Sequence, residues 1–146
     1  MPKSIILLLL IAISGCSFKQ GDLFNENQFK ANDNKASVLI YRIKQLTGSA
    51  VLTPVYINGK KQDFSLSCGS FATVNLDPGE YVFHTKARDW MTPIAKRTKI
   101  SVEAGKEYLM RFKTKIYVVE MVDTFELVPK DIAVNELKNM RKSLEK

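Results

Sequence analysis

The sequence predicts a mainly β protein: an antiparallel β-sandwich of about seven strands, followed by one amphipathic helix at the C-terminus. Between Ala36 and Val128, short β-branched and aromatic runs alternate with turn residues. Two of the turns have a chemical basis. Asn58-Gly59 tolerates the two positive φ angles of a type I′ hairpin turn, and Asp77-Pro78-Gly79 combines a preset φ with a glycine. The 146 residues, of which 45% are hydrophobic and 25% charged, match one ordinary globular domain.

The extended runs follow one another closely along the chain. The first is expected to be a central strand, because apolar side chains such as Val38 and Leu39 occupy both of its faces. Pro54 lies inside the second run and cannot donate a ladder hydrogen bond, which predicts an edge or a bulge there. The fourth and fifth runs are expected to form a hairpin around Pro78-Gly79. The expected strands cover residues 36–44, 51–58, 60–67, 71–76, 80–87, 95–102, 107–115 and 116–128.

The last segment, residues 129–146, predicts the helix. An apolar stripe formed by Ala133, Leu137, Met140 and Leu144 follows the helical period, and Asp131 is placed to cap the N-terminus. We expect the stripe to pack on the sheet. The alternative is a cationic amphipathic helix that lies on a membrane or a partner.

Residues 1–15 predict a secretory signal peptide, because a positive charge at Lys3 precedes a short apolar run and two small residues. The apolar run is shorter than the roughly 20 residues that a membrane-spanning helix needs. The ending Ile13-Ser14-Gly15-Cys16 resembles the lipobox of bacterial lipoproteins. That resemblance implies cleavage before Cys16, a diacylglycerol on its sulfur and acylation of its new amino group. A secretory signal without lipid is the alternative.

The same resemblance implies a location. In lipoproteins an aspartate after the lipidated cysteine marks retention in the inner membrane, and this chain has Ser17 there. The implied location is therefore the outer membrane, on its periplasmic face. Residues 16–35 are polar and lack a steady period, which predicts the lipidated N-terminus and a flexible tether. Phe24 and Phe29 within it either dip into the headgroup region or dock onto the domain.

Charge and cysteine content restrict the partners. Removal of residues 1–15 takes only Lys3 from the 22 Lys and Arg, which leaves 21 against 15 Asp and Glu, a net charge of +6. This balance favours anionic headgroups or cell-wall polymers, with a solvated mixed surface as the alternative. We expect no nucleic-acid partner for an exported protein. Once Cys16 carries lipid, Cys68 has no partner within the chain and stays a free thiol.

Three turn segments carry a second resemblance. They are similar to the strand and turn pattern of PEGA-type domains. The segments are Val55-Tyr56-Ile57-Asn58-Gly59-Lys60, Leu76-Asp77-Pro78-Gly79-Glu80-Tyr81-Val82 and Val102-Glu103-Ala104-Gly105-Lys106-Glu107-Tyr108. The chain resembles most a family of small bacterial lipoproteins of unknown function that carry one such domain. The resemblance implies a β-sandwich domain over residues 36–128 and no catalytic residues.

The sequence offers little for catalysis. It contains one histidine, His84, and one free cysteine, Cys68, and no third group that would orient such a pair is visible. A thiol-dependent envelope enzyme or redox sensor using these two residues is the alternative function. One histidine and one thiol make no zinc site, and neither a phosphate-binding loop nor a calcium loop is present. We therefore expect no metal and no cofactor other than the covalent lipid.

A candidate contact site lies late in the chain. Trp90 and Met91 fall in an expected loop, and Lys96, Arg97 and Lys99 follow closely. Loops on a rigid sandwich often carry binding, and aromatic with basic residues suits a glycan, a lipid headgroup or a protein. The alternative is that Trp90 fills one end of the sandwich. The sequence thus predicts a non-enzymatic binding or assembly module, anchored in the cell envelope.

Overall fold

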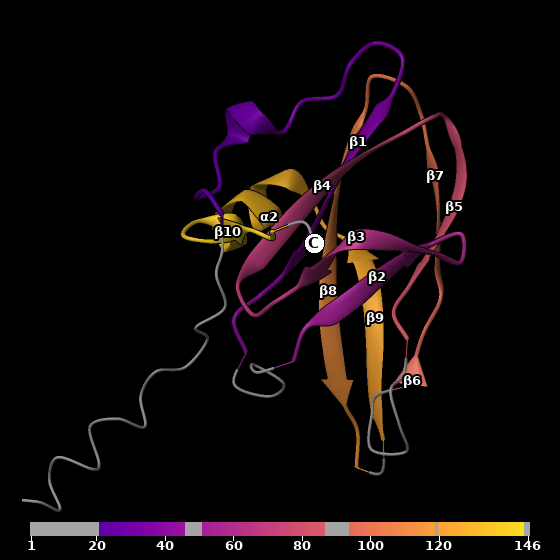
Figure 1. Cartoon of the computed structure of the whole chain (residues 1–146), viewed down its shortest axis with the longest axis vertical. Coiled ribbons are helices and arrows are strands. Elements are labelled where there is room, and N and C mark those ends of the chain that lie inside the picture. The colour runs from indigo at the N-terminus through magenta and orange to yellow at the C-terminus, as the bar shows by residue number, and fades with distance from the viewer. Residues whose placement is uncertain (1–20, 46–50, 87–93, 119, 145–146) are drawn as a thin grey trace, which may run out of the picture.

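Two β-sheets pack face to face, and a short helix covers the outer face of the larger sheet (Figure 1). The computed structural model describes residues 21–45, 51–86, 94–118 and 120–144. The six-stranded sheet has the order β10-β4-β1-β8-β9-β6, and the four-stranded sheet has the order β3-β2-β5-β7. The strands are β1 (Ala36–Arg42), β2 (Thr53–Ile57), β3 (Lys60–Leu66), β4 (Ser70–Leu76), β5 (Gly79–His84), β6 (Ile94–Ala95), β7 (Thr98–Val102), β8 (Glu107–Ile116), β9 (Met121–Leu127) and β10 (Arg141–Lys142). The helices are η2 (Glu26–Gln28) and α2 (Lys130–Leu137). A mainly β sandwich with one C-terminal helix, as predicted, is confirmed.

The main core lies between the two sheets. Every second residue of a strand points to the same side, so each strand contributes alternate apolar side chains to this layer. The buried residues of this core are Ala36, Val38, Ile40, Val55, Ile57, Phe64, Leu66, Ala72, Phe83, Ile100, Val102, Met110, Phe112 and Phe125.

A second core lies on the other face of the larger sheet. Leu39 and Tyr41 of β1 meet Ala133 and Leu137 of α2 there, together with Met140 beyond the helix. All seven residues of β1 are buried, because this strand has a packed layer on each side. The expected central strand is therefore confirmed. Of the predicted helical stripe, Ala133, Leu137 and Met140 pack on the sheet, whereas Leu144 lies beyond the helix and is 50% exposed.

The turn at Asn58-Gly59 forms as predicted. Both residues have positive φ, 49° and 78°, and β2 pairs antiparallel with β3 across the turn. Pro54 lies beside a register shift between β2 and β3, which is the bulge expected there. The strand itself is not at an edge, because β5 pairs with its other side.

The expected hairpin around Pro78-Gly79 is wrong. β4 pairs with β1 in the larger sheet, whereas β5 pairs with β2 and β7 in the smaller one. The turn therefore carries the chain from one sheet to the other. Strand directions are mixed as well, since β1 and β8 run parallel. Side-chain alternation has the same period in both directions, so the sequence pattern does not distinguish them.

The helix is shorter than expected. It ends at Leu137, and Asn139 adopts φ 68°, a left-handed conformation that turns the chain away. The chain then continues as β10, which pairs with β4. Asp131 lies in the first turn of the helix and does not cap it, because Pro129 holds the N-cap position.

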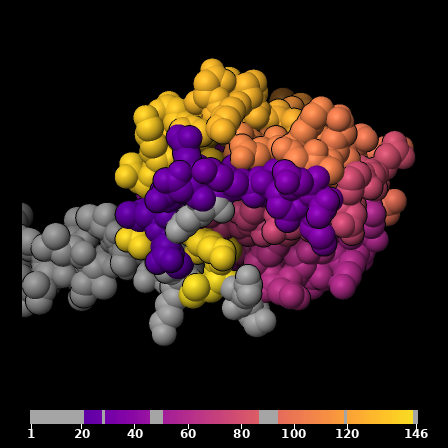
Figure 2. All heavy atoms as spheres, turned by 90° about the horizontal axis from the view of Figure 1, so that it is seen from above, coloured from indigo at the N-terminus to yellow at the C-terminus, as the bar shows by residue number. Residues whose placement is uncertain are grey.

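Residues 21–35, which the sequence predicts as part of a flexible tether, lie against the fold. Gly21 donates its backbone N–H to the carbonyl of Lys142 at 2.7 Å, and Phe24 donates its own to Met140 at 2.9 Å. Phe29 is buried in the second core, with only 4% of its surface exposed. Seen from above, the indigo N-terminal segment runs beside the yellow C-terminal one (Figure 2). Phe24 and Phe29 therefore dock on the domain, which is one of the two alternatives given for them above. We call residues 21–29 the N-terminal strap.

Candidate functional site

The hairpin of β8 and β9 ends in an exposed apolar tip. β8 is the longest strand of the described chain, with ten residues, and its last turn brings Tyr117 N–H to the carbonyl of Glu120 at 2.7 Å. Ile116 and Tyr117 are 62% and 52% exposed, and Val118 is fully exposed. The hairpin reaches the lower end of the molecule in Figure 1, past the ends of the smaller sheet's strands β2 and β3.

Strand β6 lies beside this tip. It pairs parallel with β9, so that Ile94 is opposite Val122, and the backbone N–H of Lys96 donates to the carbonyl of Asp123 at 2.9 Å. Ile94 adds a further exposed apolar side chain, at 56% exposure. The pairing places Lys96 and the exposed Arg97 within a few residues of the tip along β9.

Cations outnumber acids around the tip. Lys96, Arg97, Lys113 and Lys115 form no ion pair with any other residue that the structure describes. Their acidic neighbours are Glu120, which is exposed in the turn, and Asp123, which is half-buried beneath it. We define the tip surface as Ile94, Lys96, Arg97, Lys113, Lys115, Ile116, Tyr117 and Val118.

The predicted contact site is only partly assembled. Lys96 and Arg97 belong to the tip surface. Lys99 lies on β7 of the smaller sheet and is ion-paired with Glu80 at 2.9 Å. Trp90 and Met91 lie outside the described residues. The sequence does not reveal the tip, because residues 116–118 are apolar and fall at the start of an expected extended run, residues 116–128. The sequence feature that could have indicated the tip is an apolar run, residues 116–118, at the place where two long strands have to be joined by a turn.

Beneath the tip, the core ends in a buried arginine. Nη1 of Arg42 donates to the carbonyl of Val51 at 2.6 Å and to Oγ1 of Thr53 at 3.0 Å, and its guanidinium carbon lies 5.6 Å from the centre of the Phe112 ring. These contacts satisfy a charge that would otherwise be costly to bury.

Asp123 sits at the same end of the core. Burial raises the pKa of its carboxyl group, while the hydrogen bond from Oγ1 of Thr114, at 2.6 Å, and the charge of Arg42 offset part of that rise. The carboxylate is thus held in a place that disfavours its charged form.

A second polar cluster joins the helix to the larger sheet. Arg111 of β8 donates to Glu126 of β9, with Nε at 2.8 Å, and also to Glu136 of α2. The hydroxyl of Tyr41 donates to the other oxygen of Glu136 at 2.6 Å. Burial and this hydrogen bond raise the pKa of Tyr41 well above its ordinary value, so it stays a neutral donor. Every group here has a protein partner, which indicates a structural cluster that fixes α2 in place.

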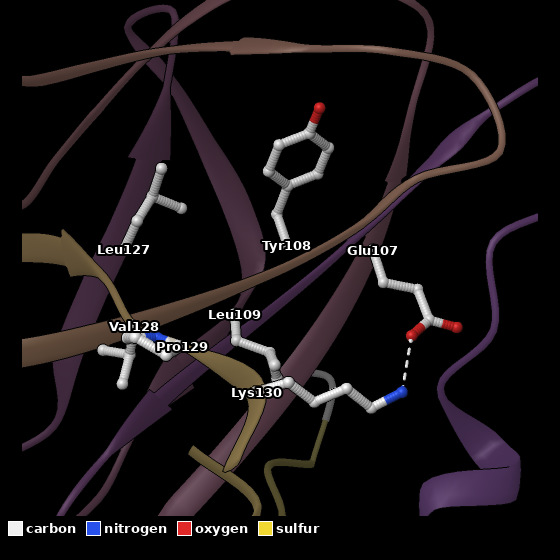
Figure 3. A pocket seen from close by; sticks show the side chains of 7 residues that line it. All are labelled: Glu107, Tyr108, Leu109, Leu127, Val128, Pro129 and Lys130. Carbon is white, nitrogen blue, oxygen red and sulfur yellow. Dashed lines mark hydrogen bonds and ion pairs between the residues drawn. The ribbon is translucent and has the colours of Figure 1, made fainter. Parts of the chain in front are cut away.

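An open groove of about 460 Å³ lies where β9 leads into the helix (Figure 3). Lys130 spans it and forms an ion pair with Glu107 at 3.2 Å, drawn as a dashed line in Figure 3. The remaining lining residues are Tyr108, Leu109, Leu127, Val128 and Pro129. Its lining contains no histidine or cysteine, and its one carboxylate, that of Glu107, is paired with Lys130. A second groove of about 460 Å³ separates the strap from the end of the helix, between Leu23 and Val134.

The two residues of the alternative enzyme site have separate surroundings. Cys68 is 5% exposed in the turn between β3 and β4, and its sulfur lies 3.6 Å from the carbonyl of Gln45. His84 lies on β5, where its ring stacks on Tyr56 with centroids 5.1 Å apart, and its Nδ1 is 2.9 Å from the carbonyl of Thr85. No hydrogen bond joins Cys68 to His84 in the described part of the chain. Within those residues, no three His, Cys, Asp or Glu side chains gather as a metal site would require.

The fold and the tip define a class of protein: a small two-sheet β domain with an exposed apolar and basic end, in which none of the described helices is long and apolar enough to cross a bilayer. Residues 32–125 match the family described as "Protein of unknown function (DUF2846)". Because this match covers more than half of the chain, the protein belongs to that family. A search of curated proteins finds no match to the chain.

Proposed function

We propose that this protein is a bacterial lipoprotein that serves as a non-enzymatic binding or assembly module, anchored to the periplasmic face of the outer membrane. The observation that carries the proposal is the sequence of residues 1–16, in which a short signal peptide ends in Ile13-Ser14-Gly15-Cys16. A lipid with two or three acyl chains on Cys16 anchors stably, because one chain alone binds only marginally. The β-sandwich fold of this chain and its membership of a family of unknown function are both compatible with this role.

The docked strap sets how far the domain stands from such an anchor. Gly21 is held to the fold by Lys142, and it follows Cys16 by five residues. A chain of that length spans at most about 18 Å. The anchored domain would therefore lie close to the bilayer and could not extend far from it.

The tip surface supports the binding part of the proposal. It joins exposed apolar side chains to cations that have no ion-pair partner among the described residues. Exposed apolar clusters on a soluble domain commonly mark interaction sites. Two residues of the predicted contact site, Lys96 and Arg97, belong to this surface, so we keep the expected partners: an envelope protein, a glycan or the membrane itself.

An in-cell photo-cross-link tests the binding part. A photoreactive residue at position 97 is expected to capture an envelope component, identified by mass spectrometry, and to lose it in the Cys16→Ser variant. The same residue at position 61, where Lys61 is exposed on β3 away from the tip, is the control. Equal capture from both positions, or capture of a protein partner that does not depend on Cys16, would contradict the proposal.

The alternative thiol enzyme gains no support from the surroundings of Cys68. A reactive cysteine is usually partly exposed and next to a positive group, whereas this one is buried. We expect the folded protein to resist a maleimide reagent at neutral pH and to react after addition of urea. Rapid labelling of the native thiol would instead favour the enzyme or redox sensor.

A further inference from the structure

We propose that the tip surface inserts into an anionic phospholipid bilayer and gives the protein a second membrane contact. This inference rests on the proposed function and names the partner of its contact surface. Three observations carry it: the shape of the tip, its side chains and its position relative to the strap.

The tip is a protruding, exposed surface. Ile116, Tyr117 and Val118 lie at the end of a hairpin with more than half of their surface exposed, and neither of the two grooves described above is lined by them. A convex apolar tip has to be buried inside something larger. A bilayer interface accepts such side chains at the level of the headgroups, where tyrosine is favoured.

The charges favour an anionic bilayer over a neutral apolar surface. Lys96, Arg97, Lys113 and Lys115 surround the apolar tip, against Glu120 and the half-buried Asp123. Basic side chains near an anionic membrane each strengthen binding, by about fivefold. Apolar insertion and headgroup attraction therefore act at the same end of the molecule.

The position of the tip allows both membrane contacts at once. Gly21 is hydrogen-bonded to Lys142 of β10. Across the larger sheet, Lys142 lies opposite Phe71, Phe71 opposite Tyr41, and Tyr41 opposite Arg111 of β8, so these four residues lie at the same height. The tip lies about seven residues further along β8 and three strands away, roughly 25 Å from Gly21. Because the chain from Cys16 to Gly21 reaches up to about 18 Å, the lipid and the tip can enter the same bilayer side by side.

A vesicle flotation experiment tests this contact without the lipid anchor. The protein is residues 16–146 with Cys16→Ser, which retains both cores, since all their buried residues lie between Phe29 and Met140. We expect it to float with vesicles that contain phosphatidylglycerol and to stay behind with phosphatidylcholine alone. High salt is expected to weaken the binding, because it screens the lysines and the arginine.

Variants assign the binding to the tip. Replacing Ile116, Tyr117 and Val118 by serine is expected to weaken binding at least tenfold, and Lys115→Ala about fivefold. Lys61→Ala, which removes an exposed lysine on β3, is the matched control and is expected to keep most of the binding. Circular dichroism of each variant checks that the fold is retained. The inference is overturned if the parent protein ignores phosphatidylglycerol, or if folded tip variants bind as well as the parent.

The outcomes separate this inference from the proposed function. If cells attach lipid to Cys16 while the chain without lipid ignores anionic vesicles, the anchor stands and the tip contact falls. If tip variants lose a specific protein cross-link but vesicle binding is absent, the tip is a protein contact and the lipid inference is wrong. If the chain binds anionic vesicles but carries no lipid in cells, the tip contact stands and the lipoprotein proposal falls.

Discussion

Arg42 and Asp123 place two charges at one end of a largely apolar core. The arginine is satisfied by Val51, Thr53 and the face of Phe112. Asp123 has a hydrogen bond from Thr114, yet the pKa of its carboxyl group is raised, because burial outweighs that bond and the charge of Arg42. The sign of this shift has a consequence for stability.

A carboxyl group whose pKa is raised in the folded state stabilises the fold below its unfolded pKa, near 3.9, and loses that contribution as pH rises through the folded pKa. Asp123→Asn mimics the neutral form and can still accept from Thr114. We therefore expect the variant to be more stable than the parent at pH 7 and equal to it at acidic pH, measured by urea unfolding. Glu120→Gln, at an exposed position, is the control. A less stable Asp123→Asn variant at pH 7 would contradict this sign.

Arg111 is the centre of the cluster that fixes α2 on the sheet. Its removal leaves Glu126 and Glu136 facing each other, half-buried and without their cation. We expect Arg111→Ala to lower the free energy of unfolding by about 2 kcal/mol, because hydrogen bonds to charged groups are the strong ones. Lys130→Ala, which removes the more exposed pair with Glu107, is expected to cost less than about 1 kcal/mol. Equal losses in urea unfolding would mean that the cluster does not fix the helix.

Among the elements, the N-terminal strap is predicted from the sequence as part of a flexible tether, yet it packs on the domain and contributes to its second core. Phe24 packs edge-on against Phe71 of β4, with ring centroids 5.5 Å apart, and Phe29 lies deeper in the second core. The strap and the C-terminal segment 140–142 also share backbone hydrogen bonds. The two segments therefore support each other at one edge of the larger sheet.

Phe29→Ala tests the docking of the strap. Truncation of a buried phenylalanine leaves a cavity, and we expect a loss of about 3 kcal/mol in the free energy of unfolding. Leu23→Ala, at a half-exposed position in the same segment, is expected to change stability by less than about 0.5 kcal/mol. If the two variants were equally stable in urea, the strap would not be docked in solution.

Local turn chemistry and burial patterns were sufficient for several elements. Asn58-Gly59 predicted its hairpin because both residues accept positive φ, and the apolar faces of β1 predicted a strand covered on both sides. The sheet assignment of β4 and β5 was not predictable, because a turn such as Asp77-Pro78-Gly79 fits a hairpin and a crossover equally. The end of α2 was missed because Leu144 continues the helical spacing, although Asn139 adopts the left-handed conformation that ends it.

At the scale of the whole molecule, the strap and the tip lie at different places on the larger sheet. The strap holds the N-terminus at the β10 edge, and the β8–β9 hairpin presents Ile116, Tyr117 and Val118 at its end. The sequence marked Lys96 and Arg97 as candidate contacts because they follow an aromatic loop. It did not reveal the tip, since the pairing of β6 with β9 that brings these cations beside it is a long-range contact.

The proposed lipid anchor requires a mature protein that begins at a lipidated Cys16, and the intact mass of protein purified from its own cells reports this. We predict a chain that starts at Cys16 and carries a diacylglycerol on its sulfur and an acyl group on its amino nitrogen. In the Cys16→Ser variant both lipid masses should be absent. A wild-type protein that retains residues 1–15, or one that begins at Cys16 without lipid, would contradict the proposed anchor.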